Sequence, residues 1–277
     1  MKSLYSMFLS QAYQDCWDDY NRSVKLKNFP RWDYVILTAS NDQQAEGFRR
    51  QIEERKEYLP AGTRFAAIPD RGGERVGSGG ATLEVLKYLH EQEGDFRKLR
   101  VLVIHSGGDS KRVPQYSALG KLFSPVPHQL PDGRSSTLFD EFMICMSSVP
   151  SRIPKSKVQQ SGDVPLLLNP PQSDHTNVGA AAISFKERAQ PGQNHGVYVN
   201  GEDGNVKCCL QKKSEEELRK AGAVNEAGCV DFDTGALIFS TAMMDSLYSL
   251  IGTVEGYDRY VNGTVRLSLF ADFLYPL

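Results

Sequence analysis

A glycine-rich turn that carries an arginine and a lysine is the part of this sequence best equipped for chemistry. Its candidate residues are Gly107, Gly108, Ser110, Arg112 and Lys121, and they follow a short apolar run that predicts a buried strand. Paired glycines let backbone N–H groups approach phosphate oxygens, and a serine hydroxyl adds a donor. A guanidinium fork matches phosphate geometry, and a lysine supplies a compact charge. A solvated turn would explain a bare Gly-Gly, but the full set predicts a polyphosphate site with Arg112 and Lys121 as catalytic cations.

Spacing excludes the two most common phosphate motifs. A Walker A loop requires a glycine five residues before Gly120 and a serine or threonine after Lys121. Gln115 and Leu122 occupy those positions, so the chain is not a P-loop NTPase. The dinucleotide-binding fingerprint is excluded as well, because Thr82 stands where its third glycine belongs.

A second glycine-rich turn leads into a predicted helix. Its candidate ligand-binding residues are Gly77, Gly79 and Gly80. Helix N-termini attract anions and polar edges of ligands, because their first backbone N–H groups have no partner within the helix. An ordinary turn and helix start is an equally good interpretation of this segment alone. The nearby polyphosphate site favours the ligand-binding interpretation.

Two aspartates are candidate ligands for a divalent cation. Asp163 follows the strand predicted over 157–160, and Mg²⁺ prefers one or two carboxylates together with phosphate oxygens and water. A lone aspartate in such a position is more often a turn or helix-cap residue, but the polyphosphate site favours Mg²⁺. Asp233, in a turn expected before a strand at 235–239, is a candidate second ligand, and a structural turn role is equally open.

Three further polar residues stand next to predicted strands and are candidate contacts to a sugar or phosphate. His195 precedes one strand, and Gln211 and Lys212 follow another. A hairpin turn and a solvated charge run are the alternatives for these segments. No Ser/His/Asp or Cys/His relay with a local signature is present. Positioning, fixed cations and a metal ion are therefore the simpler basis for catalysis.

Composition narrows the class of protein. The chain has 277 residues, of which 40% are hydrophobic and 24% charged, as in ordinary globular proteins. A net charge of −2 gives no electrostatic argument for nucleic-acid or membrane partners. The five cysteines lack C-x-x-C spacing, which argues against a disulfide framework and a zinc site. Because no signal-peptide pattern is visible, we expect a cytoplasmic protein. The predicted polyphosphate site indicates that its partners are small molecules.

Alternating strands and helices predict an α/β fold with a mostly parallel or mixed sheet and helices on both faces. Strands are expected over 34–38, 64–69 and 101–105, with helices after the first two. Ligands in such folds bind at the carboxyl ends of strands, where both glycine-rich turns lie. Residues 1–30 are expected to form a helical extension and residues 31–277 the main domain, truncated at its apolar C-terminal end.

Several of these segments together resemble the N-terminal part of the bifunctional L-fucokinase/GDP-fucose pyrophosphorylase family. The resemblance is carried, in order, by residues 32–40, 76–83, 105–114, 138–140, 161–164, 194–197, 210–212 and 233–235. Lys213 departs from the family pattern, in which proline is usual at that position.

The resemblance implies a Rossmann-like nucleotidyltransferase that makes GDP-fucose and pyrophosphate from GTP and L-fucose 1-phosphate, with Mg²⁺. It implies that the 107–110 loop and Arg112 hold the triphosphate, that Lys121 bridges the α-phosphate and the sugar phosphate, and that the 77–82 turn borders the nucleoside. Longer family members continue into a β-helical segment and a GHMP-type sugar kinase, which are expected partners in the full-length chain. Two alternatives remain: a non-catalytic domain attached to an L-fucokinase, and an enzyme for another sugar 1-phosphate.

Overall fold

The chain folds around one eight-stranded mixed sheet. The computed structural model describes residues 4–106, 114–116, 120–153, 157–161, 179–190, 195–261, 265–268 and 272–273. In chain order the described strands are β1 (Tyr34–Ala39), β2 (Arg64–Pro69), β3 (Arg100–His105), β4 (Pro125–Gln129), β5 (Ser135–Thr137), β6 (Lys157–Ser161), β7 (Ala180–Arg188), β8 (Gly196–Asn200), β9 (Val206–Gln211) and β10 (Cys229–Phe239). The described helices are α1 (Leu4–Lys25), α2 (Asp42–Glu54), α3 (Gly77–Glu93), α4 (Leu138–Cys145), α5 (Glu215–Lys220), α6 (Thr241–Ser249) and α7 (Val254–Tyr260).

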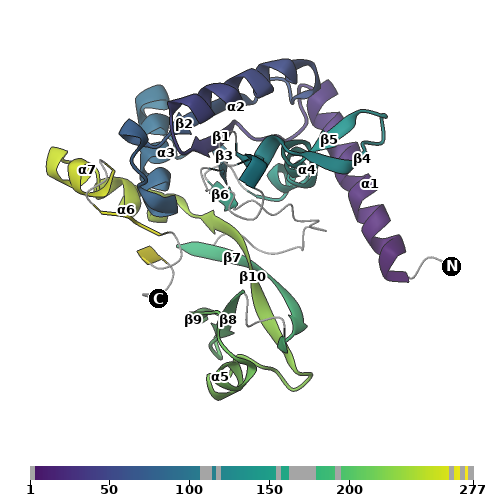
Figure 1. Ribbon diagram of the computed structural model, residues 1–277, viewed down its shortest axis with the longest axis vertical. Helices are drawn as coiled ribbons and strands as arrows, with labels where there is room; N and C mark the ends of the chain where they lie inside the picture. The colour runs from purple at the N-terminus through teal and green to yellow at the C-terminus, as the bar shows by residue number, and fades with distance from the viewer. Residues whose placement is uncertain are drawn as a thin grey trace.

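The sheet is parallel on one side and antiparallel on the other. Its strand order is β2-β1-β3-β6-β10-β8-β9, with β7 paired to β10, while β4 and β5 form a separate hairpin. The neighbours β2, β1, β3 and β6 all run parallel, and every pairing of β10 is antiparallel. Figure 1 shows β7 and β10 leaving the helix-covered part of the molecule and reaching a second lobe with β8, β9 and α5.

Helices cover both faces of the parallel strands. All six residues of β1 are buried, as expected of a central strand that is covered on both sides. Alternate residues of β1 and β3 face two separate cores, one shared with α1, α2 and α4 and the other with α3 and α6. The predicted α/β class, with a mixed sheet and helices on both faces, is confirmed.

Local sequence signals explain where two of the helices begin. The Asn41 side chain accepts a hydrogen bond from the Gln44 backbone N–H (2.8 Å) and caps α2. Helix α4 begins with a capping box in which Thr137 and Asp140 satisfy one another's backbone N–H groups. In contrast, α3 begins at Gly77 without a side-chain cap. Its first N–H groups are therefore left for partners outside the helix.

Strand β10 contains the largest departure from the sequence prediction. A turn was expected at Asp233-Thr234-Gly235, before a strand starting at Gly235. This prediction was wrong: β10 runs from Cys229 to Phe239, and the segment forms a bulge between Asp233 and Ala236. Gly235 has φ +74°, a left-handed conformation that glycine adopts easily. The bulge lets one strand pair with β6 at one end and with β8 at the other.

The N-terminal helix and two smaller elements complete the fold. Helix α1 contributes Cys16, Trp17 and Tyr20 to the core that contains β1. The β4–β5 hairpin and α7 were not predicted from the sequence; both are short and have weak hydrophobic periodicity. Within the described part of the chain, no helix is long and apolar enough to cross a membrane.

Candidate functional site

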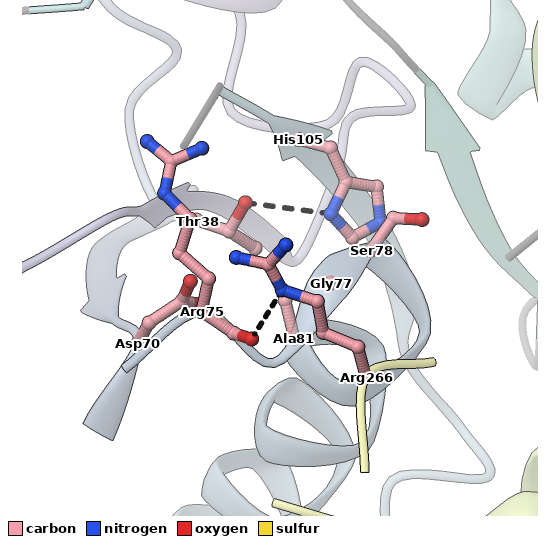
Figure 2. Close-up of a pocket in the computed structure, with 8 residues that line it drawn as sticks. All are labelled: Thr38, Asp70, Arg75, Gly77, Ser78, Ala81, His105 and Arg266. Carbon is pink, nitrogen blue, oxygen red and sulfur yellow. Dashed lines mark hydrogen bonds between the residues drawn. The ribbon is translucent and has the colours of Figure 1, made fainter. Parts of the chain in front are cut away.

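A pocket of about 360 Å³ opens at the carboxyl ends of β1, β2 and β3, beside the start of α3. Figure 2 shows the residues that line it, which are Thr38, Asp70, Arg75, Gly77, Ser78, Ala81, His105 and Arg266. Strand β1 pairs with β2 on one side and with β3 on the other, so the chain reverses its direction of travel across the sheet here. Such a reversal point is where open α/β sheets bind ligands. The pocket therefore lies at the edge of the sheet where the sequence predicts a site.

The second glycine-rich turn lies against a segment from the far end of the chain. The Gly79 N–H donates to the Leu267 carbonyl oxygen (2.9 Å), and the Leu267 N–H donates to the Val76 carbonyl oxygen (3.0 Å). A Cβ on Gly77 would lie 2.2 Å from the Leu267 oxygen, and one on Gly79 would lie 2.8 Å from the Leu267 Cβ. A Cβ on Gly80 would lie 2.6 Å from the Val76 Cβ. These glycines are required by close packing, and Gly77 also lines the pocket.

Three charged side chains from distant segments meet in the pocket. Asp70 follows β2, Arg75 precedes α3, and Arg266 belongs to the segment that lies on the glycine-rich turn. Figure 2 shows the Arg266 guanidinium directed into the pocket, with its Nε donating to the Arg75 carbonyl oxygen (3.0 Å). Burial raises the pKa of the Asp70 carboxyl to about 6, although Arg75, the Val76 N–H and Arg266 all lower it. The pocket therefore presents two cations and one partly desolvated carboxylate.

Hydroxyl groups fix the orientation of His105 at the end of β3. Its Nδ1 lies 3.3 Å from the Thr38 Oγ1, and its Nε2 lies 3.4 Å from the Thr82 Oγ1. Because the Thr82 hydroxyl donates its proton to the Ser78 carbonyl oxygen (2.8 Å), it accepts from the imidazole. The contact with Thr82 therefore assigns a proton to Nε2.

Lys121 is the one residue of the predicted polyphosphate loop that the structure describes. Gly107, Gly108, Ser110 and Arg112 lie outside the described residues. Lys121 starts a single helical turn immediately after Gly120, which has φ +75°. A Cβ on Gly120 would lie 3.0 Å from the Gln44 Nε2 of α2, so the glycine permits a close approach to that helix.

The second lobe contains Asp233, the predicted second metal ligand, together with the three residues predicted to contact a sugar or phosphate, which are His195, Gln211 and Lys212. Asp233 accepts hydrogen bonds at Oδ1 from the Tyr198 hydroxyl (2.8 Å) and from the Gly235 N–H (2.7 Å). A Cβ on Gly196 would lie 2.5 Å from the Gln211 Nε2 and 3.1 Å from the Asp233 Oδ2. The side chains of Gln211 and Asp233 therefore lie next to one another across β8.

His195 and Lys212, the other two predicted contacts to a sugar or phosphate, lie beside Gln211 and Asp233. His195 is exposed, and its ring meets the Phe232 ring edge-on at 5.7 Å between centroids. Its carbonyl oxygen accepts a hydrogen bond from the Lys212 N–H (3.1 Å). Lys212 has φ +50°, a conformation that costs a residue with a Cβ about 1–2 kcal/mol. Such strain is often found at ligand-binding sites.

Asp233 is the one predicted metal ligand that the structure describes. Among the described residues, no group of three or more His, Cys, Asp or Glu side chains is arranged to hold a metal ion. Asp163 lies outside the described residues. Asp233 lies on β10 beyond Ala236, which pairs with Ser161, the last residue of β6. The position of Asp233 is thus just past the end of β6.

Sequence reasoning assigned no role to Asp70, Arg75 or Arg266. Asp70 directly follows a predicted strand, which is the signal that singled out Asp163, so the same rule applied to every strand would have found it. Arg75 stands two residues before Gly77 and carries a weaker local signal. Arg266 is 191 residues away from Arg75 in the chain, and no local pattern connects the two.

Together, the fold and the pocket define a mixed α/β protein with a charged pocket at the carboxyl edge of its parallel strands. A family model described as the fucose pyrophosphorylase domain matches residues 94–277. The chain belongs to this fucose pyrophosphorylase family.

Relatives with established names share this sequence over limited parts of their length. Fucose-1-phosphate guanylyltransferase of Mus musculus is 42% identical over 99 residues, which cover 35% of this chain and 17% of the relative. Bifunctional fucokinase/GDP-fucose pyrophosphorylase of Arabidopsis thaliana is 29% identical over 245 residues, covering 75% of this chain and 23% of the relative. The human fucose-1-phosphate guanylyltransferase is 38% identical over 99 residues, with 35% and 16% covered. The chain therefore spans less than a quarter of the length of these relatives.

Proposed function

We propose that this chain is the nucleotidyltransferase part of an enzyme that makes GDP-fucose and pyrophosphate from GTP and L-fucose 1-phosphate. The observation that carries the proposal is the charged pocket at the carboxyl ends of β1, β2 and β3, in a chain of the fucose pyrophosphorylase family. Arg75 and Arg266 give this pocket a positive field that attracts a nucleoside triphosphate. The choice of fucose as the sugar and guanine as the base is based on the names of the relatives. The Rossmann-like nucleotidyltransferase fold is part of the same proposal.

The proposed reaction is an in-line displacement at the α-phosphorus of GTP. An oxygen of the sugar phosphate forms the new P–O bond, the bond to the β-phosphate oxygen breaks, and pyrophosphate leaves with the electron pair. Negative charge builds up on phosphate oxygens, so fixed cations and donors are the main requirement. Arg112 and the backbone N–H groups of Gly107, Gly108 and Ser110 would hold the triphosphate. Lys121 would bridge the α-phosphate and the sugar phosphate.

Mg²⁺ is the proposed metal ion, held by Asp163 with Asp233. Asp233 suits this role in two respects: it lies just past the end of β6, and its two hydrogen-bond donors occupy Oδ1, whereas Oδ2 faces Gly196. Carboxylate oxygens are the protein ligands that Mg²⁺ prefers. When bound, Mg²⁺ would neutralise the phosphate charge. His195, Gln211 and Lys212 are proposed to contact the sugar phosphate from the second lobe.

The wider setting of this enzyme is also a proposal. We expect a cytoplasmic protein whose partners are small-molecule substrates, with no nucleic acid and no membrane. In the full-length protein, a β-helical segment and a GHMP-type sugar kinase are proposed to follow. The name of the Arabidopsis thaliana relative, which combines fucokinase and GDP-fucose pyrophosphorylase, supports this arrangement.

Lys121→Ala tests the proposed function. The chain is incubated with GTP, L-fucose 1-phosphate and Mg²⁺, and pyrophosphate release is measured. Removing a preorganised cation that stabilises the transition state costs about 10²–10³ in rate. Lys27→Ala is the matched control, because Lys27 is exposed beyond the end of α1 and far from the predicted loop in sequence. Equal turnover by the two variants, or no turnover by the unmodified chain with any nucleoside triphosphate, would contradict the proposal.

A further inference from the structure

The pocket beside the glycine-rich turn has the size and position of a small-molecule site. Its volume of about 360 Å³ falls within the range of roughly 300–1,000 Å³ that is typical of such sites. Lys121 and the predicted polyphosphate loop follow β3, whereas Asp70 follows β2 and Gly77 starts α3. In the sheet, β1 lies between β2 and β3. Asp70, at the end of β2, is therefore separated by β1 from the end of β3, where the predicted loop starts. The pocket can thus hold a part of the ligand other than its phosphates.

Asp70 is the only carboxylate among the described residues that line this pocket. The N–H of Val76 is directed at it, and within the described part of the chain no side chain donates a hydrogen bond to it. Two guanidinium groups, those of Arg75 and Arg266, are close enough to lower its pKa. A half-buried carboxylate with so few partners is suited to accept hydrogen bonds from a ligand, because burial leaves its lone pairs poorly solvated.

The carboxylate and the guanidinium groups face the same space. Figure 2 shows Asp70 on one side of the pocket and the Arg266 guanidinium reaching toward its centre. The hydrogen bond from the Arg266 Nε to the Arg75 carbonyl oxygen fixes that guanidinium and leaves its terminal N–H groups directed into the pocket. One ligand in this pocket could therefore donate hydrogen bonds to the two Asp70 carboxylate oxygens and accept hydrogen bonds from the Arg266 guanidinium.

This combination matches one base better than the others. The Watson–Crick edge of guanine carries two adjacent donors, N1–H and the 2-amino group, next to one acceptor, O6. A carboxylate can accept from both donors at once, while a guanidinium donates to O6. Adenine and cytosine place a ring nitrogen lone pair where guanine has N1–H, so a carboxylate would repel them. Uracil has a single ring N–H between two carbonyl groups, and one carboxylate oxygen would face a carbonyl.

We propose that Asp70 selects guanine in this pocket by accepting hydrogen bonds from its N1–H and 2-amino groups, with Arg266 donating to O6. This inference rests on the proposed function, since it names the group that distinguishes GTP from other nucleoside triphosphates. Asp70 is in this role a specificity-determining residue and takes no part in the transfer itself. The glycine-rich turn would pack against the base, because Gly77 and Ser78 line the same pocket.

The test compares three purine nucleotides whose Watson–Crick edges differ at the 2-position of the base. ITP lacks the 2-amino group, and XTP carries an oxygen in its place. Binding of GTP, ITP, XTP and ATP to the chain is measured by calorimetry. For the unmodified chain we expect GTP to bind best, ITP about tenfold to a hundredfold more weakly, and XTP more weakly still, because loss of a charge-assisted hydrogen bond has this size. Equal binding of GTP and ITP overturns the inference without any variant.

Asp70→Asn should invert this order. The asparagine amide oxygen still accepts from N1–H, but its NH₂ group faces the 2-position, where it meets the amino group of GTP and donates to the oxygen of XTP. The variant should therefore bind XTP best and GTP worst. Glu84→Gln is the matched control: Glu84 is a second carboxylate close enough to raise the pKa of Asp70, but it does not line this pocket. It should keep the order of the unmodified chain.

The outcomes separate this inference from the proposed function. If the unmodified chain prefers GTP and Asp70→Asn keeps the same order, the base is read elsewhere and the proposed function stands. If the unmodified chain binds no nucleoside triphosphate, the proposed function fails first. An inverted order in Asp70→Asn, with the order unchanged in Glu84→Gln, supports both.

Discussion

Gly79→Ala is a direct test of the contact between the glycine-rich turn and the segment around Leu267. In this variant the new Cβ would lie 2.8 Å from the Leu267 Cβ and 3.1 Å from its carbonyl carbon and oxygen. Cβ atoms do not approach other heavy atoms this closely, and the three Leu267 atoms belong to the backbone or adjoin it, so the segment must move. Moving it weakens the Gly79–Leu267 and Leu267–Val76 backbone hydrogen bonds, each worth about 0.5–1.5 kcal/mol.

The net effect follows from two opposing contributions. Loss of the two hydrogen bonds and the strain of overpacking together cost about 2–5 kcal/mol. Alanine is better than glycine in a helix by about 1 kcal/mol, which offsets part of this loss. We therefore expect Gly79→Ala to lower the free energy of unfolding by about 1–4 kcal/mol. For a chain of this size, each kcal/mol lowers Tm by about 2–4 °C.

Gly47→Ala provides the matched control for this prediction. Gly47 also lies in a helix, α2, and a Cβ there would meet nothing within 4 Å. The substitution should stabilise the protein by about 0.5–1 kcal/mol, because only the helix propensity changes. Thermal unfolding followed by circular dichroism measures both variants under the same conditions. If Gly79→Ala raises Tm as Gly47→Ala does, the segment around Leu267 does not lie on the turn, and the reasoning fails.

Three further outcomes are expected. Asp140→Ala removes both the capping box of α4 and the partly buried ion pair with Arg55 (3.2 Å), so urea unfolding should show a loss of about 2–4 kcal/mol; an unchanged midpoint would contradict this. Trp32→Phe leaves the buried Met146 carbonyl oxygen without its Trp32 donor (3.0 Å) and should cost about 1–3 kcal/mol in the same assay, whereas a cost near zero would show that the bond contributes nothing. The pKa of Asp70 is raised to about 6 in the folded state, so the charged carboxylate destabilises the fold above that pH, and protonation relieves this as pH falls from the folded pKa to the unfolded one. Asp70→Asn should then be more stable than the unmodified chain at pH 7.5, by about 1–2 kcal/mol after allowance for solvent screening; the difference should fall to about half near pH 5 and disappear below about pH 4. A difference that does not vary with pH would exclude a raised pKa.

Helices and strands with strong periodicity were predictable because their local sequence carries the signal. The apolar strands at β1, β2 and β3 and the Asn41 cap of α2 were all visible in the residues themselves. The β10 bulge was not, because Asp233-Thr234-Gly235 is typical of a turn when read alone. Pairing of β10 with β7 on one side, and with β6 and β8 on the other, supplies the hydrogen bonds that keep this segment within one strand.

The sequence by itself determined the α/β class and the family, because these depend on local patterns and on motifs in a fixed order. The site at the carboxyl ends of the parallel strands stays a prediction. The sequence also placed Gly77 and Gly79 in a glycine-rich turn at the start of a helix, but it did not show what packs on that turn. Only the tertiary structure decided that Leu267 lies on that turn and that Arg266 joins Asp70 in one pocket. The physical reason is that contacts between residues far apart in the chain depend on how the whole sheet and its helices pack, and no local pattern encodes that packing.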